Sequence, residues 1–312
     1  MIEAVAATAG TQAEGSHASP TGAGVAPPAG EVVYFDGRYA LKSQVMVSPD
    51  DRGFLLGDGV YEVAGAYDGR FVALDRHMDR LRHSLRESRI DESIAEPLES
   101  VFTGLLERNG FADSGKAMVY LQVTRGAAPR THAFPKHPVR PTVYAYAAPF
   151  SLVGELSGGV SAITRPDLRW SRCDIKSISL MANVLANQEA KESGAFEAIL
   201  IRDGVVLEGT HTSLFGIVNG EVRTAPLSNL ILRGITREIA IELCRANDIP
   251  LREAALTEDE LRHADELFLT GTTTEVVPIL AVDENPVADG KPGPLTTRIA
   301  DLYRAEIRIA AS

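Results

Sequence analysis

The stretch SRCDIKSISLMANVLANQEA, residues 171–190, places Lys176 directly before a run that carries no charge until Glu189. The chain has only six lysines, and the other five lie beside strands, in loops or on a helix, where we expect solvent to reach them. Partial burial of Lys176 would disfavour the ammonium and lower the pKa of the amine. An amine in that state can form a Schiff base. Two alternatives stay open: the side chain extends from a helix start into solvent, or it pairs with Asp174.

Composition limits the class of protein. The 312 residues are 45% hydrophobic and 23% charged, which is enough to bury a large core in one large domain or two ordinary ones. The net charge of −11 and the lack of any lysine or arginine block argue against nucleic acid or an acidic membrane surface as a partner. No apolar run is long enough to span a bilayer. A small anionic substrate remains compatible with local arginines.

The cysteines and histidines point away from disulfides and metals. Cys173 and Cys244 are the only cysteines, and neither belongs to a CxxC pair, which fits a protein of the reducing cytoplasm. The seven histidines are scattered, with no HExxH motif and no paired Cys/His spacing. We therefore expect no metal site.

The chain divides into an extension and two halves. Residues 1–30 are rich in Ala, Gly, Pro, Ser and Thr and predict a disordered extension that is neither a signal nor a transit peptide. A first domain is expected over 31–149, a linker over 150–159, where Gly and Pro punctuate the sequence, and a second domain over 160–312.

Periodicity predicts an α+β protein. In the first half we expect hairpins at Asp36-Gly37 and Asp68-Gly69, helices over 75–89 and 95–109, and strands over 117–125 and 141–149. In the second half, turn signals at Asp203-Gly204 and Asn219-Gly220 separate strands. The elements expected there are helices over 181–193, 235–246 and 295–308 and strands over 196–201, 205–208, 213–218, 221–224, 265–270 and 276–282.

A Schiff-base lysine that serves a phosphorylated cofactor also needs an anion site, and two segments offer one. In LILRGITREIAIEL the amides of Ile235 and Thr236 and the Thr236 hydroxyl open a helix, whose positive end favours a phosphate. In LTGTTTEVV, Gly271 permits close backbone approach and Thr272 adds an amide and a hydroxyl. The alternatives are an ordinary helix start and an ordinary polar turn.

Glu208 is the candidate counter-charge for a ring nitrogen. It ends a strand in GVVLEGTHTSLFGI that should be largely buried, and a buried carboxylate needs a partner. A protonated pyridine nitrogen would be such a partner and would keep the ring electron-withdrawing. The alternative is a glutamate that caps a hairpin in solvent.

Seven blocks now carry a resemblance to a known family. In order, they are RGFLLGDGVYE, HMDRL, YLQVTRGAAPRTHAFP, DIKSISLMANVLA, LEGTHTSLFGI, ILRGITR and GTTTEVVP, and the match around them runs from about residue 32 to 308. The chain resembles the fold-type IV pyridoxal-phosphate (PLP) enzymes, that is, the class IV aminotransferases, and within them the D-amino acid aminotransferases. The resemblance implies two α/β domains joined by a short linker, with PLP in the cleft between them.

The resemblance also implies a role for each matched residue. Lys176 matches the lysine that holds PLP as a Schiff base and later moves a proton, and Glu208 matches the carboxylate at the pyridine nitrogen. Arg80 of HMDRL matches the phosphate arginine, helped by Ile235, Thr236, Gly271 and Thr272, and Leu232 matches a residue on the ring face. Without the resemblance, Arg80 would read as a solvated helix residue.

Substrate choice rests on PRTHAFP. Arg130 and His132 are two apart, so in an extended segment both point the same way and could hold a carboxylate. The resemblance places such a pair, with a tyrosine matched by Tyr61, around the substrate α-carboxylate and implies ping-pong transamination of D-amino acids with 2-oxo acids. The alternatives are a branched-chain L-amino acid or (R)-amine transaminase, a lyase similar to aminodeoxychorismate lyase, and a non-catalytic PLP-binding protein. The resemblance further implies a homodimer with the site near the subunit interface.

Overall fold

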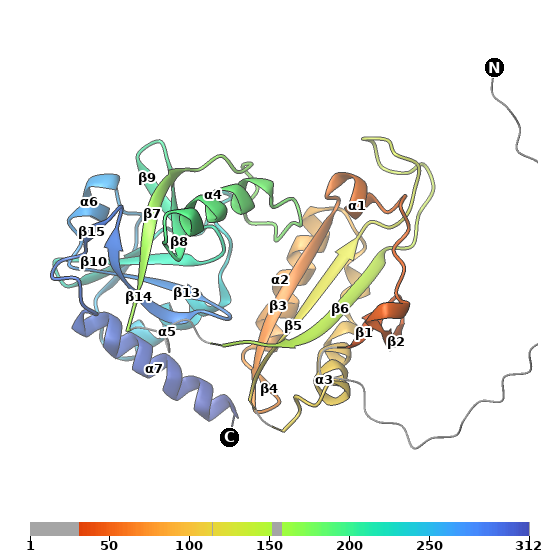
Figure 1. Ribbon diagram of the computed structural model, residues 1–312, viewed down its shortest axis with the longest axis horizontal. Helices are drawn as coiled ribbons and strands as arrows, with labels where there is room; N and C mark the ends of the chain where they lie inside the picture. The colour runs from red at the N-terminus through yellow and green to blue at the C-terminus, as the bar shows by residue number, and fades with distance from the viewer. Residues whose placement is uncertain (1–30, 114, 152–157, 312) are drawn as a thin grey trace, which may run out of the picture.

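The computed structural model describes residues 31–113, 115–151 and 158–311, and these form two sheets that lie side by side (Figure 1). The predicted extension, residues 1–30, lies outside the described residues, as do positions 152–157 of the predicted linker. One sheet is built from the chain before this gap and the other from the chain after it. The predicted domain boundaries fall where the chain passes between the two sheets.

The first half is a six-stranded antiparallel sheet in the order β2-β1-β6-β5-β3-β4. Helices α2 and α3 pack on one face of this sheet and bury Leu81, Leu85 and Phe102 against it (Figure 1). The elements are β1 (Val32–Phe35), β2 (Arg38–Leu41), α1 (Arg52–Leu56), β3 (Gly59–Tyr67), β4 (Arg70–Phe71), α2 (Leu74–Glu87), α3 (Leu98–Arg108), β5 (Lys116–Thr124) and β6 (Thr142–Pro149), with 3₁₀ turns at Lys42–Gln44 and Glu92–Ala95.

The second half is a nine-stranded mixed sheet. Its strand order is β12-β11-β10-β13-β14-β7-β8-β9, with β15 paired to β14. The elements are β7 (Val160–Pro166), α4 (Met181–Glu192), β8 (Glu197–Arg202), β9 (Val205–Gly209), β10 (Ser213–Val218), β11 (Glu221–Thr224), α5 (Ile235–Ala246), β12 (Leu251–Glu253), α6 (Glu258–Arg262), β13 (Glu266–Gly271), β14 (Glu275–Val282), β15 (Asn285–Pro286) and α7 (Pro294–Ala311).

Strand β13 lies at the centre of this sheet and is covered on both faces. Phe268 packs under α5 and α7, whereas Leu267 and Leu269 face a second apolar layer that includes Leu256 and Val277. A strand buried on both sides carries a continuous apolar run, as LFL (residues 267–269) does here.

The expected hairpins are confirmed. At Asp36-Gly37, Asp68-Gly69, Asp203-Gly204 and Asn219-Gly220 both turn residues have positive φ, the geometry that matches the twist of the flanking strands.

Strands β7 and β12 and helices α1 and α6 were not predicted from the sequence. Helix α1 is a short turn held by Asp51, whose carboxylate accepts hydrogen bonds from the Gly53 amide and the Thr124 and Thr142 hydroxyls.

The two halves share a buried contact between Tyr67 of β3 and Glu275 of β14. The Tyr67 hydroxyl donates to Glu275 Oε1 at 2.7 Å, and both residues are buried. Burial, reinforced by the Glu275 charge, raises the pKa of Tyr67, so the phenol stays protonated and keeps its donor role. The bond links the last residue of β3 in the first sheet to the first residue of β14 in the second.

We predict that Tyr67→Phe lowers the free energy of unfolding by about 1–3 kcal/mol, because it leaves a buried carboxylate without this donor. Urea denaturation of the cofactor-free protein measures the change. Tyr34→Phe, at a half-buried tyrosine of the first sheet, is the matched control. Equal effects of the two substitutions would contradict the prediction.

Candidate active site

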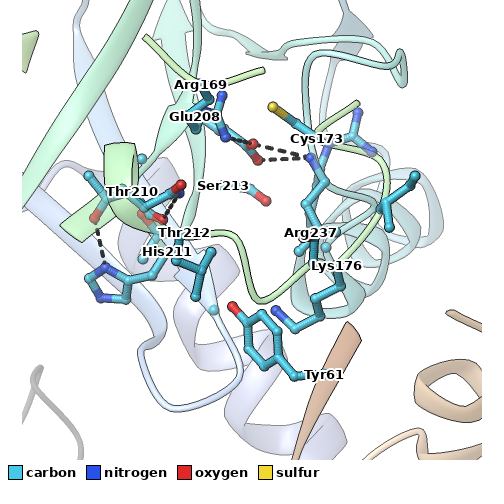
Figure 2. A pocket seen from close by; sticks show the side chains of 18 of the residues that line it. Tyr61, Arg169, Cys173, Lys176, Glu208, Thr210, His211, Thr212, Ser213 and Arg237 are labelled. Atoms are coloured by element: carbon cyan, nitrogen blue, oxygen red, sulfur yellow. Dashed lines mark hydrogen bonds and ion pairs between the residues drawn. The ribbon is translucent and has the colours of Figure 1, made fainter. Parts of the chain in front are cut away.

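A cavity of about 290 Å³ lies between the two halves, and most of the predicted site residues line it. The first half contributes Tyr61 and Arg80. The second contributes Lys176, Glu208, Leu232, Ile235, Thr236, Gly271 and Thr272. Figure 2 shows Lys176 and Tyr61 on one side of this cavity and Glu208 on the other.

Lys176 lies in an irregular segment between β7 and α4 that is fastened to the first half. Its carbonyl accepts a hydrogen bond from the Tyr61 amide at 2.9 Å, and its amide donates to Ser84 Oγ at 3.1 Å. The half-buried side chain places Nζ 4.3 Å from the centroid of the Tyr61 ring. Asp174 pairs instead with Arg172 at 2.9 Å and lies 3.4 Å from His83, so the alternative pairing of Asp174 with Lys176 is not what the structure has.

Glu208, at the end of β9, is buried, which excludes the reading of a solvent-exposed cap. Arg169 Nη1 donates to its Oε1 at 2.5 Å, and the Leu232 amide donates to both carboxylate oxygens at 3.1 and 3.2 Å. Burial raises the pKa of Glu208 to about 7, and Arg169 offsets only part of that rise. The carboxyl is therefore balanced between its charged and neutral forms and has capacity for a further cationic partner.

Arg80 extends from α2 into the cavity and is buried, contrary to its reading as a solvated helix residue. Its Nε and Nη2 bind the two oxygens of Glu62 at 3.0 and 2.5 Å, and its Nη1 donates to the Arg233 carbonyl at 2.8 Å. Burial alone would raise the pKa of Glu62, but Arg80 and His77 hold it well below its usual range. Glu62 therefore fixes a permanent cation at this end of the cavity.

The first turn of α5 faces the same end. Gly234 precedes the helix, and no side chain caps the first amides. A Cβ at Gly234 would lie 2.6 Å from Ser213 Oγ and 3.2 Å from Arg237 Cβ, so a larger residue between the helix start and β10 would displace these side chains. Among the described residues, buried Arg237 Nε and Thr270 Oγ1 have no hydrogen-bond partner, and both residues line the cavity. Free amides, a glycine and unpaired buried donors are what an anion such as a phosphate needs.

Arg130 and His132 do not line the cavity of their own chain. They are exposed in the segment between β5 and β6, which is not a strand there, so the expected extended alternation does not hold. The segment is anchored elsewhere: Arg52 Nη1 donates to the Thr131 carbonyl at 2.7 Å, and the Arg125 guanidinium lies 3.8 Å from the Phe134 ring centroid.

Two sets of ion pairs that involve buried carboxylates were not predicted from the sequence. The first is Arg169, held by Asp167 and Glu208. The second is Glu197, which pairs with His211 at the cavity. A single charged residue within the apolar strand sequence FEAILI is the signal that could have identified Glu197, and the charge within VYEVAG could have identified Glu62 in the same way.

We predict a pH-dependent difference between cofactor-free wild-type protein and Glu208→Gln. The folded-state pKa of Glu208, about 7, exceeds the ordinary value of 4.5, so the folded state binds this proton more tightly. Wild-type stability therefore falls, relative to the variant, as pH rises through this window. Urea titrations should show the difference growing by about 3 kcal/mol from pH ~4 to pH ~8. Parallel curves would exclude a raised pKa.

Comparison with known proteins agrees with this geometry. The family model for amino-transferase class IV matches residues 59–282. The D-alanine aminotransferase of Bacillus licheniformis is 45% identical over 277 residues, covering 88% of this chain and 96% of that protein. That of Staphylococcus haemolyticus is 37% identical, covering 90% and 99%.

Solved structures give the same fold. A fold IV transaminase from Curtobacterium pusillum is 26% identical with a TM-score of 0.75, covering 86% of this chain and 93% of that one. The branched-chain aminotransferase of Thermoproteus uzoniensis, solved with norvaline, is 29% identical with a TM-score of 0.79, covering 89% and 95%. The chain therefore belongs to the amino-transferase class IV family of PLP-dependent enzymes and has their fold type IV.

Proposed function

We propose that the protein transfers the amino group of D-amino acids, of the D-alanine and D-glutamate type, to 2-oxo acids such as 2-oxoglutarate or pyruvate by a ping-pong mechanism. The observation that carries this proposal is one cavity that holds a lysine, a buried carboxylate and an anion site together. The choice of D-amino acids rests on D-alanine aminotransferases that are 45% and 37% identical over nearly the whole chain.

The residues present fit PLP. Lys176 would join its aldehyde, Glu208 would face its ring nitrogen, and Leu232 would lie on its ring. Its phosphate would be bound by Arg80, by the first turn of α5 (Ile235 and Thr236) and by the turn at Gly271 and Thr272. The unpaired buried atoms Arg237 Nε and Thr270 Oγ1 lie in the same lining and support this orientation. When bound, PLP supplies an electron-withdrawing ring that accepts the electron pair of the substrate Cα–H bond.

The chain's own groups then have separate tasks. The Lys176 amine would take the proton from the substrate α-carbon and would deliver it to the former aldehyde carbon of the cofactor. Arg169 and the Leu232 amide hold Glu208 in place by hydrogen bonds. A cationic ring partner would favour the charged form of Glu208 and so draw its pKa back down.

Arg130 and His132 are predicted to bind the substrate α-carboxylate, but within a single chain they do not line the cavity. We propose that a homodimer brings Arg130 and His132 of one subunit to the cavity of the other. Helix α4 supports this, because it buries only Ala190 yet leaves Met181, Val184 and Leu185 71%, 57% and 58% exposed on one face. Such an apolar stripe indicates a protein contact. Leu168 and Trp170 extend this apolar surface to the cavity lining.

A branched-chain aminotransferase is the second candidate, since one such enzyme is 29% identical and shares the fold. The preferred amino donor separates the two functions.

Within residues 31–113, 115–151 and 158–311, the helices are too short or too polar to span a bilayer. Both cysteines are free, in keeping with the cytoplasm as the proposed location.

We predict that the visible absorption of the purified, PLP-loaded protein changes on addition of D-alanine and stays unchanged with L-alanine. Borohydride reduction followed by peptide mapping should place the pyridoxyl label on Lys176. Lys176→Ala should lose label and turnover, whereas Lys291→Ala, at an exposed loop lysine, should keep both. An absorption change with L-alanine or L-leucine, and none with D-alanine, would instead favour a branched-chain aminotransferase.

We predict complementation between inactive variants if Arg130 acts across a dimer. Arg130→Ala and Lys176→Ala subunits, mixed after unfolding and refolding together, should regain about a quarter of wild-type activity, because half of the dimers are mixed and each carries one complete site. Light scattering checks the dimer. A mixture that stays as inactive as its parents would contradict this arrangement.

A further inference from the structure

Glu197, at the start of β8, is a fully buried carboxylate beside the cavity. It accepts hydrogen bonds from the Ala198 amide at 2.9 Å, the Thr212 hydroxyl at 2.8 Å and the Thr210 hydroxyl at 2.5 Å. An ionised carboxylate without water also needs a cation nearby. Among the described residues, the cationic partner within ion-pair distance is His211, whose Nδ1 lies 3.0 Å from Glu197 Oε2.

The hydrogen bonds fix which nitrogen of His211 carries a proton. Nδ1 faces Glu197 and the Thr210 hydroxyl oxygen, 3.1 Å away. Thr210 already donates its own proton to Glu197, so both neighbours of Nδ1 are acceptors. Nδ1 is therefore the donor, and Nε2 remains for a group outside the pair. Burial alone would raise the pKa of Glu197, but His211 and the two threonines lower it to about 2, so the carboxylate stays ionised.

His211 lines the cavity and its side chain is 47% exposed. Figure 2 shows it on the turn that carries Thr210 and Thr212, on the opposite side of the view from Arg237. The buried guanidiniums of the lining are already engaged by carboxylates: Arg80 by Glu62, Arg169 by Glu208 and Arg237 by Glu253. Lys176 is committed to the cofactor. His211 is also paired with a carboxylate, but its ring is partly exposed and its Nε2 has no hydrogen-bond partner among the described residues, so this nitrogen is free to meet substrate.

We propose that His211 binds the distal carboxylate of dicarboxylic substrates, D-glutamate and 2-oxoglutarate, through Nε2, and that Glu197 is the positioning residue that holds the imidazole by Nδ1. This inference rests on the proposed function and adds a specificity residue to it. A monocarboxylic substrate such as D-alanine or pyruvate has no group for His211 to bind. The contact with His211 therefore favours dicarboxylic substrates and leaves monocarboxylic ones unaffected.

The test compares His211→Gln with wild-type holoenzyme. We expect kcat/KM for D-glutamate and 2-oxoglutarate to fall roughly 10- to 100-fold, the range for one lost hydrogen bond to a charged group, and the values for D-2-aminobutyrate and pyruvate to stay within about threefold. His211→Lys keeps a cation and should restore much of the preference. His263→Gln, at an exposed histidine of α6, should change neither.

Binding provides a readout apart from turnover. Calorimetric titration of the holoenzyme with glutarate should show the same loss in His211→Gln and a smaller one in Glu197→Gln, while propionate binding stays unchanged. Equal losses for both substrate classes would overturn the proposal and assign His211 to the α-carboxylate or to folding. If wild type turns over no D-amino acid yet binds glutarate in a His211-dependent way, the proposed function fails and the role of His211 stands.

Discussion

The backbone of Lys176 is hydrogen-bonded to the first half of the chain, and the site depends on this attachment. The segment that carries the lysine follows β7 of one sheet, yet its amide and carbonyl bond to Ser84 of α2 and to Tyr61 of β3. The amine is therefore held where the two halves meet, with no helix or strand of its own. Any shift of β3 relative to the second sheet would move the reactive nitrogen with it.

Three buried carboxylates surround the cavity, and their different partners give them different tasks. Glu62 binds a guanidinium through both oxygens and stays charged, so it serves to fix Arg80. Glu197 pairs with an imidazole that remains partly exposed. Glu208 has one guanidinium and one amide, which leave the pKa of its carboxyl near 7 and leave it open to a cationic ligand. The most weakly paired of these acids faces the predicted position of the cofactor ring.

Local signals in the sequence were enough for much of the fold. Helix α5 occupies the expected residues, and the four Asx-Gly turns form as expected, because these features depend on neighbours along the chain. Strand β7 was missed, since its short run contains Arg165 and its pairing with β8 and β14 is non-local. Of the site, Lys176, Glu208 and Arg80 lie in the cavity as anticipated. Arg169 was missed because only the fold brings PDLRW next to Glu208. Arg130 does not line the cavity, because the segment between β5 and β6 that carries it is anchored elsewhere.

The Tyr67–Glu275 bond has a thermodynamic consequence once a ligand occupies the space between the sheets. Without ligand, this bond and the Lys176 attachment are among the polar contacts that join the two halves. A cofactor held by Arg80 on one side and by α5 on the other adds its binding free energy to the junction itself. Loading with cofactor should therefore strengthen the association of the two halves, so that the prosthetic group acts as part of the fold.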